Sequence, residues 1–217
     1  MNGWQIGEDR LKGNKEAVKN LLEFVEEGDR ILDIGCGDGS IGSILTEEID
    51  CVYEGYDIQS DAEIRLEKKG FKFNPKLENI DNKYDLIMLI DVIEHLDINK
   101  INFIHSQIIR LLKKGGRLLI KTPNADRCMF LMDHFYNNPE HLRPFPHESI
   151  RVLFYENFEI EKVKYFGNFK HPLKIILNLI LYRRTPKECA LYSLKKDIKP
   201  ILLNNLNQVV KSKKHLI

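Results

Sequence analysis

The chain has 217 residues, a formal net charge of +1, 43% hydrophobic residues and 30% charged residues. This length suffices for one α/β domain with a sizeable core, and no stretch reaches the roughly 20 apolar residues that a membrane-spanning helix needs. The composition therefore argues against a disordered chain and an integral membrane protein. The first residues lack a basic and apolar signal segment, so we expect a cytoplasmic protein with reduced cysteines.

The two ends of the chain differ in charge. From Lys162 onward there are 13 Lys and Arg residues against two acids, a surplus of +11, whereas the preceding part carries −10. Basic clusters of this kind are typical of surfaces that meet anions. A solvated tail, an anionic membrane surface and, less favoured, a nucleic acid all stay open as interpretations of the basic end.

A glycine-rich loop is the main feature of the first part of the chain. Apolar residues at helical spacing predict a helix over residues 14–26, which leads into a strand over residues 30–34. A loop follows with glycine at every second position, and residues 40–46 are expected to be helical. Glycine accepts positive φ and has no Cβ, so the N–H groups of such a loop can face a bound molecule.

The spacing of the glycines narrows the choice of ligand. A dinucleotide fingerprint would have its third glycine at position 40, which is serine here, and the Gly-Lys-Ser/Thr ending of a phosphate-binding loop is missing. The run Asp33-Ile34-Gly35-Cys36-Gly37-Asp38-Gly39 resembles motif I of the class I S-adenosylmethionine-dependent methyltransferases. The resemblance implies that S-adenosylmethionine is the cofactor. It places Asp33 below the methionine portion and wraps the cofactor with Gly35, Cys36, Gly37 and Gly39.

An acid follows the second predicted strand, which covers residues 52–57. Asp57 lies 18 residues beyond Gly39, where the carboxyl end of strand two meets the glycine loop in a doubly wound sheet. A carboxylate there can accept hydrogen bonds from both ribose hydroxyls. We therefore predict that Asp57 binds the ribose and that Ile58 lies against the adenine.

A second motif follows strand four. Residues 84–90 form a nearly continuous apolar run, as expected for a parallel strand buried on both faces. The next residues, Asp91-Val92-Ile93-Glu94-His95-Leu96, resemble the end of strand four in a methyltransferase subgroup that includes ubiquinone-biosynthesis O-methyltransferases and enzymes of glycan and natural-product pathways. The resemblance implies that Asp91 and Val92 border the methionine end of the cofactor, while Glu94 and His95 open the following helix.

The remaining elements complete the expected fold. The resemblance implies an α/β, doubly wound, mostly parallel seven-stranded sheet of the Rossmann-like methyltransferase fold, in the order 3-2-1-4-5-7-6. One methyltransferase domain would cover residues 1–195, followed by a basic C-terminal extension over residues 196–217. Further predicted elements are helices over 63–69, 102–113 (capped by Gly115-Gly116) and 146–155, strands over 71–73, 117–121, 158–166 and 189–195, a functional loop over 125–147, and a helical insertion between strands six and seven over 167–187.

The insertion contains an apolar segment over residues 173–182, followed by Arg183-Arg184. A core helix, a homodimer helix and a helix at a membrane surface are all compatible with this pattern. An apolar face next to arginines suits an anionic bilayer interface. We therefore hypothesise a peripheral membrane association, which would bring the enzyme to a lipid-linked acceptor.

Three residues are the candidates for catalysis. Methyl transfer to a hydroxyl group requires removal of its proton, and His141, His95 and Glu94 are the residues expected near the acceptor. Asp91, Glu94, His95 and a later histidine also resemble the E-x-x-E-H…H metal site of small-RNA 2′-O-methyltransferases, although the first acid here is Asp. We predict O-methylation of a sugar-containing or lipid-linked small acceptor. A metal-dependent RNA 2′-O-methyltransferase and a non-catalytic cofactor-binding module remain alternatives.

Overall fold

The computed structural model describes residues 18–123, 135–136, 138–166 and 189–196. These residues form a seven-stranded sheet in the order β3-β2-β1-β4-β5-β7-β6, as the resemblance implied. Strands β1 to β5 are parallel, and β7 runs antiparallel to both of its neighbours. The elements are η1 (Leu22–Phe24), β1 (Arg30–Ile34), α2 (Ser40–Glu48), β2 (Val52–Tyr56), α3 (Ala62–Glu67), β3 (Lys72–Phe73), η2 (Leu77–Asn79), β4 (Tyr84–Ile90), η3 (Ile93–His95), α4 (Ile98–Leu111), β5 (Leu112–Pro123), α6 (His147–Phe154), β6 (Phe158–Phe166) and β7 (Cys189–Lys196).

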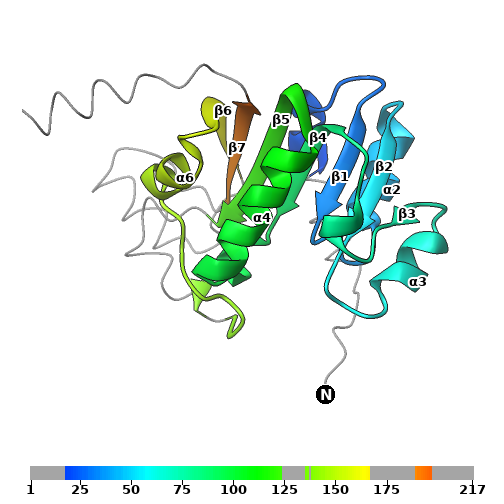
Figure 1. Cartoon of the computed structure of the whole chain (residues 1–217), viewed down its shortest axis with the longest axis horizontal. Helices are drawn as coiled ribbons and strands as arrows, with labels where there is room; N and C mark the ends of the chain where they lie inside the picture. Colours follow the sequence, from blue (N-terminus) through cyan, green and yellow to red (C-terminus); the bar gives the residue numbers. More distant parts are fainter. Residues whose placement is uncertain (1–17, 124–134, 137, 167–188, 197–217) are drawn as a thin grey trace, which may run out of the picture.

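Alternate residues of the central strands face two separate cores. Leu32 and Ile87 belong to the core that includes α4 and α6, whereas Ile31 and Met88 belong to the core on the side of η1 and α2. Figure 1 shows α4 in front of the sheet and α2 behind it. Because the sheet is covered on both faces, the loops at the carboxyl ends of the parallel strands are where a ligand site is expected.

The connection between α4 and β5 differs from the prediction. The helix begins at Ile98, where the Asp97 side chain accepts a hydrogen bond from the Lys100 N–H (3.0 Å), and it ends at Leu111, before the two glycines. Gly115 and Gly116 are part of strand β5 and do not cap the helix. They lie where the pairing with β4 shifts register, and a Cβ on Gly116 would lie 3.1 Å from the Asp85 carbonyl oxygen. The lack of a side chain at Gly116 therefore allows a close approach of two strands, whereas Gly115 has open space around its Cβ position and a φ of +71°.

The first predicted helix is also shorter at its C-terminal end. Residues 18–21 are helical and continue into η1, after which the chain leaves the helical conformation at Val25. The N–H of Glu26 donates to Asp29 Oδ2 (2.7 Å) instead of to a helical carbonyl oxygen. A side-chain acceptor of this kind competes with helix formation, so the predicted helix to residue 26 was too long.

Several predictions concern residues outside the described part of the chain. They include residues 125–134 and 137 of the loop predicted over 125–147, the insertion over 167–187 with its apolar segment, and the extension beyond Lys196, which itself belongs to β7. The other predicted strands and helices agree with the observed elements to within a few residues. No helix among the described residues is long and apolar enough to span a membrane.

Candidate functional site

The glycine loop after β1 lies where the parallel strands end. Gly35, Gly37 and Gly39 all have positive φ, of 87°, 56° and 70°. A Cβ on Gly35 would lie 2.4 Å from Val92 Cγ2, and one on Gly39 would lie 3.2 Å from a Leu66 side-chain atom. A Cβ on Gly37 would meet nothing within 4 Å. Packing therefore explains two of the glycines, while the backbone of Gly37 faces open space in which a ligand can lie.

The Asp57 carboxylate joins the end of β2 to this loop. Its Oδ2 accepts a hydrogen bond from the Gly37 N–H (2.8 Å) and its Oδ1 accepts one from the Gln59 N–H (2.8 Å). Each carboxylate oxygen has a further lone pair, so both oxygens can still accept a hydroxyl group. The neighbouring Ile58 side chain is 84% exposed, which is unusual for isoleucine and leaves it able to pack against a ligand.

Asp33 lies beneath the loop in a buried position. Its Oδ2 accepts a hydrogen bond from the Tyr53 hydroxyl (2.5 Å), and its Oδ1 is buried without a partner among the described residues. Burial raises the pKa of Asp33 to about 7, the Tyr53 hydrogen bond opposes that rise, and the charge of Asp57 adds to it. Cys36 is also buried, and burial raises the pKa of its thiol. A buried carboxylate oxygen without a partner suits the ammonium of an amino-acid tail, as in S-adenosylmethionine.

The raised pKa of Asp33 predicts a pH dependence of stability. The folded chain holds this proton up to about pH 7, whereas an unfolded chain releases it near pH 4. The stability that Asp33 contributes is therefore complete below about pH 4 and is lost as the pH rises through about 7. We expect the ligand-free protein to melt at a lower temperature at about pH 8 than at about pH 6.5.

Asp33→Asn is the matched variant for this test. An amide cannot ionise, so the decrease in melting temperature between the two pH values should be smaller in the variant. His105 and His141 titrate below this window, because burial lowers the pKa of both imidazoles, whereas Glu94, with a pKa raised to about 8, titrates within it and contributes the same decrease to both proteins. Thermal unfolding followed by circular dichroism measures the difference. An equally steep decrease in Asp33→Asn would show that Asp33 is not its source.

The chain turns sharply at the end of β4. Asp91 has φ of +56°, and it is the non-glycine residue with positive φ among the described residues. Its carboxylate is paired with Lys121, whose side chain is 9% exposed, and its N–H donates to the Lys121 carbonyl oxygen (2.9 Å). Left-handed backbone at a non-glycine residue is costly and is often found at functional sites. The turn brings Val92 against Gly35 and directs the following residues across the sheet edge.

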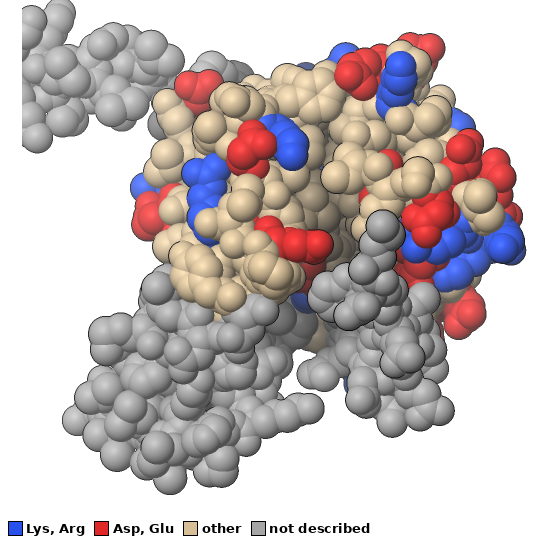
Figure 2. Space-filling model, turned by 90° about the horizontal axis from the view of Figure 1, so that it is seen from below, with Lys and Arg blue, Asp and Glu red and all other residues tan. Residues whose placement is uncertain are grey.

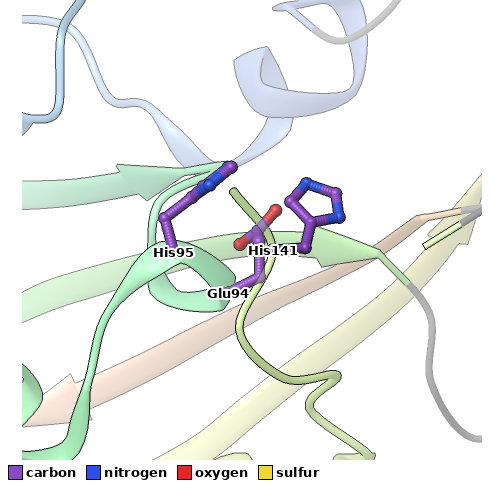
Figure 3. A group of neighbouring side chains, drawn as sticks. All are labelled: Glu94, His95 and His141. Atoms are coloured by element: carbon purple, nitrogen blue, oxygen red, sulfur yellow. The ribbon is translucent and has the colours of Figure 1, made fainter. Parts of the chain in front are cut away.

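Glu94, His95 and His141 meet at this edge (Figure 3). One donor atom from each of the three side chains lies within 4.8 Å of the others. Glu94 and His95 belong to η3, a short 3-10 turn that ends before α4, so the prediction that they open the following helix was wrong. His141 comes from the loop before α6, and the adjacent Leu142 N–H donates to the Glu94 carbonyl oxygen (2.8 Å). This main-chain hydrogen bond holds the two segments together.

Hydrogen bonds orient both imidazole rings in the same way. His95 Nδ1 lies 3.1 Å from the Glu140 carbonyl oxygen, and His141 Nδ1 lies 2.8 Å from the Phe135 carbonyl oxygen. A carbonyl oxygen can only accept, so each Nδ1 is the protonated nitrogen and each Nε2 has a lone pair in the neutral ring. The two rings contact edge to face, with centroids 4.7 Å apart.

Glu94 is almost completely buried. Its Oε2 accepts a hydrogen bond from the Thr122 hydroxyl (3.1 Å), and its Oε1 is buried without a partner among the described residues. Burial raises the pKa of Glu94 to about 8, with a further rise from the charge of Asp91. A buried, partly satisfied carboxyl group next to two histidines is typical of a functional site.

Sequence reasoning missed three residues that position the site. Tyr53 holds Asp33, Lys121 pairs with Asp91, and Thr122 holds Glu94. Tyr53 and Thr122 lie in strands, where aromatic and β-branched residues are common, so their residue types do not indicate a functional role. Lys121 had a usable signal, because a lysine in an otherwise apolar central strand requires a partner.

The edge of the sheet that these residues occupy is hollowed. Figure 2 looks onto it from below the view of Figure 1, and the described surface shows a hollow between two raised parts. The upper walls of the hollow are uncharged, and acidic side chains lie beside its lower part.

Residues from both motifs could hold ligands at this edge. The open space at Gly37, the Asp57 carboxylate and the unpartnered Asp33 oxygen fit S-adenosylmethionine. The donor set of one carboxylate and two imidazole nitrogens fits a divalent cation such as Zn²⁺, Mn²⁺ or Fe²⁺. Among the described residues this donor group lacks the fourth predicted member, Asp91, whose carboxylate is instead paired with Lys121.

Curated proteins similar to this chain include different kinds of methyltransferase. The mitochondrial ubiquinone biosynthesis O-methyltransferase of Dictyostelium discoideum is 30% identical over 141 residues, which cover 54% of this chain and 42% of that protein. The phosphoethanolamine N-methyltransferase of Plasmodium falciparum is 30% identical over 128 residues, covering 53% and 48%. The chain thus spans about half the length of these relatives.

A solved structure and a protein family extend the match to most of the chain. The structure of a SAM-dependent methyltransferase from Archaeoglobus fulgidus superposes with a TM-score of 0.69 at 22% identity, covering 87% of this chain and 97% of that one, which shows a shared fold. Residues 6–164 match the family described as "Methyltransferase domain". The chain therefore belongs to the methyltransferase-domain family and shares the fold of a SAM-dependent methyltransferase.

Proposed function

We propose that this enzyme transfers the methyl group of S-adenosylmethionine to a hydroxyl oxygen of a sugar-containing or lipid-linked acceptor. The observation that supports an oxygen acceptor most directly is the group formed by Glu94, His95 and His141. It places two imidazole rings next to a buried carboxyl group, at the same sheet edge as the glycine loop. A hydroxyl acceptor must lose a proton during methyl transfer, and a group of this kind can accept it.

His141 is the base in this proposal. Burial lowers the pKa of its imidazole, so the ring is neutral at pH 7 and its Nε2 can accept a proton. Burial raises the pKa of Glu94 to about 8, so at pH 7 this carboxyl group mostly holds its proton and is not available to accept another. The Phe135 carbonyl oxygen fixes the ring of His141 and would stabilise the imidazolium that forms. S-adenosylmethionine supplies the methyl group when bound.

The nature of the acceptor is tested by product analysis. The purified enzyme is incubated with methyl-labelled S-adenosylmethionine and, separately, with a lipid extract, a sugar-nucleotide fraction and total RNA. We expect label in the lipid or sugar fraction, and NMR of the product should place the methyl group on oxygen. A methyl group on nitrogen would overturn the proposal in favour of chemistry like that of the N-methyltransferase relatives. Label confined to RNA would favour 2′-O-methylation of RNA.

Metal-assisted O-methylation is a second candidate, because Glu94, His95 and His141 already form a three-ligand donor set. A divalent cation held by these residues would lower the pKa of a bound acceptor hydroxyl. The His95 and His141 rings are oriented by carbonyl oxygens through Nδ1, an arrangement also found behind metal-binding histidines.

Chelation separates the two candidates. If a metal takes part, dialysis against a strong chelator should abolish turnover, and one cation should restore it. Calorimetry should then show a single binding site for that cation in the wild type, and its affinity should fall by at least about tenfold in Glu94→Gln, which loses a charged ligand. Full activity after complete chelation would exclude the metal and leave proton transfer to His141.

A further inference from the structure

Strand β6 (Phe158–Phe166) is the terminal strand of the sheet in the described part of the chain, next to β7 (Figure 1). The outer edge of a terminal strand presents main-chain N–H and C=O groups that can pair with another strand. The side chains of β6 determine which partner strand can pair with this edge. They show a charge order that matches the same strand in a second copy of the chain.

A bulge in β6 sets which side chains share a face. Ile160 pairs with Leu194, and the next pair is Lys162 with Ser193, so Glu161 is the extra residue. Because of this extra residue, Ile160 and Val163 lie on the same face although they are three positions apart, and both pack against the core that includes α4 and α6. Lys162 and Lys164 lie on the opposite face, where both form ion pairs with Glu23 of η1.

The charged residues of β6 change sign at the bulge, from acidic before it to basic after it. The sequence Glu159-Ile160-Glu161-Lys162-Val163-Lys164 has two acids before its midpoint and two bases after it. We propose that β6 pairs antiparallel with β6 of a second copy, across a two-fold axis between Glu161 and Lys162. Each Glu159 then lies opposite Lys164 of the second copy, and each Ile160 lies opposite Val163.

The register follows from the two faces. Residues directly opposite in an antiparallel pair lie on the same face of the sheet. In the proposed register Ile160 meets Val163, and Phe158 meets Tyr165, on the face of the α4 and α6 core. Moving the axis by one residue in either direction places Ile160 opposite Glu161, or Lys162 opposite Val163. The proposed register is therefore the one that pairs opposite charges and apolar residues together.

The ion pairs that β6 forms with Glu23 are compatible with this pairing. The Lys162 and Lys164 side chains are 53% and 34% exposed while they contact Glu23. A lysine ammonium has three N–H donors and can serve a second carboxylate. The two-fold axis doubles every contact, and the two sheets join into one, as expected of an isologous dimer. The inference concerns assembly and is independent of the acceptor.

Charge exchange tests the register. In Glu159→Lys, two lysines face each other at both ends of the interface, and in Lys164→Glu two glutamates do so. We expect sedimentation velocity to show a dimer for the wild type and a dimerisation constant at least about tenfold weaker for each variant. An equimolar mixture of the two variants should form heterodimers, because every lysine then meets a glutamate.

Glu23→Gln is the control, because it removes the ion pairs within the chain and leaves the interface charges unchanged. This variant should dimerise like the wild type, and circular dichroism should show that all three variants are folded. A wild type that stays monomeric up to about 100 µM, well above the Kd range of specific dimers, overturns the proposal. The proposal is also wrong if Glu159→Lys and Lys164→Glu dimerise as well as the wild type. It is equally wrong if their mixture fails to restore dimers.

Discussion

Gly37→Val should abolish S-adenosylmethionine binding without unfolding the protein. Gly37 has φ of +56° and its backbone faces open space, so a valine side chain would fill the volume where the cofactor is expected. A β-branched residue is also strained in this conformation, which costs about 1–2 kcal/mol. The Gly37 N–H is bonded to Asp57, so the strain would also disturb the residue proposed to bind the ribose. Calorimetry should show at least about a hundredfold loss of affinity, a difference of about 2.7 kcal/mol.

Gly28→Val is the matched control for this variant. Gly28 has φ of +81° and open space around its Cβ position, but it precedes β1, at the opposite edge of the sheet. It therefore imposes the same kind of backbone strain away from the cofactor site. Thermal unfolding should show a similar loss of stability in both variants, while cofactor affinity is lost only in Gly37→Val. Equal cofactor affinities in the two variants would show that the cofactor does not bind at this loop.

His141→Ala should lower turnover by about 10²–10⁴-fold, the usual contribution of a positioned acid or base. Cofactor affinity should remain nearly constant, because His141 lies in the late loop and contacts Phe135 and the Glu94–His95 segment instead of the glycine loop. The wild-type rate should decrease below about pH 6, where the ring becomes protonated and can no longer accept a proton. Steady-state kinetics and calorimetry on the same preparations measure both quantities.

His141→Asn separates catalysis from loop structure. Its side-chain amide can donate to the Phe135 carbonyl oxygen as Nδ1 does, but it has no group equivalent to Nε2. If His141 is the base, the asparagine variant is as slow as the alanine variant. If asparagine restores the rate, then His141 only orders the loop, and the assignment is wrong.

The order of the sheet was predicted correctly because two signals agreed. Local patterns in the sequence located the strands, and the resemblance to known methyltransferases gave their order. The β4 run from Tyr84 to Ile90 is apolar on both faces, and the glycine loop identifies β1. Gly115 and Gly116 misled the prediction because glycines after a helix usually cap it. The role of Gly116 depends on the Asp85 carbonyl oxygen, about 30 residues away, which no local pattern reveals.

Only some residues of the candidate site were predicted, because the contacts of the others also join residues that are far apart in the sequence. His141 and Glu94 are far apart in the sequence, and only the resemblance to known methyltransferases brought them together. Thr122 and Tyr53 act through a single hydroxyl on an otherwise buried side chain, so hydropathy places them in the core. Asp91 combines a positive φ with an ion pair to Lys121 in the neighbouring strand, and a contact 30 residues away is not visible in the local sequence.

The contact between Gly35 and Val92 couples the loop after β1 to the loop after β4, so that a shift of one affects the other. There is no room for even one methyl group between the loop after β1 and the loop after β4. Any movement of Gly35 when a ligand enters is therefore passed to Val92, two residues before Glu94 and three before His95. By thermodynamic reciprocity, an acceptor held by Glu94 and His95 changes cofactor affinity by the same factor by which the cofactor changes acceptor affinity. Exchange of the departing S-adenosylhomocysteine would then report on whether the acceptor side is filled.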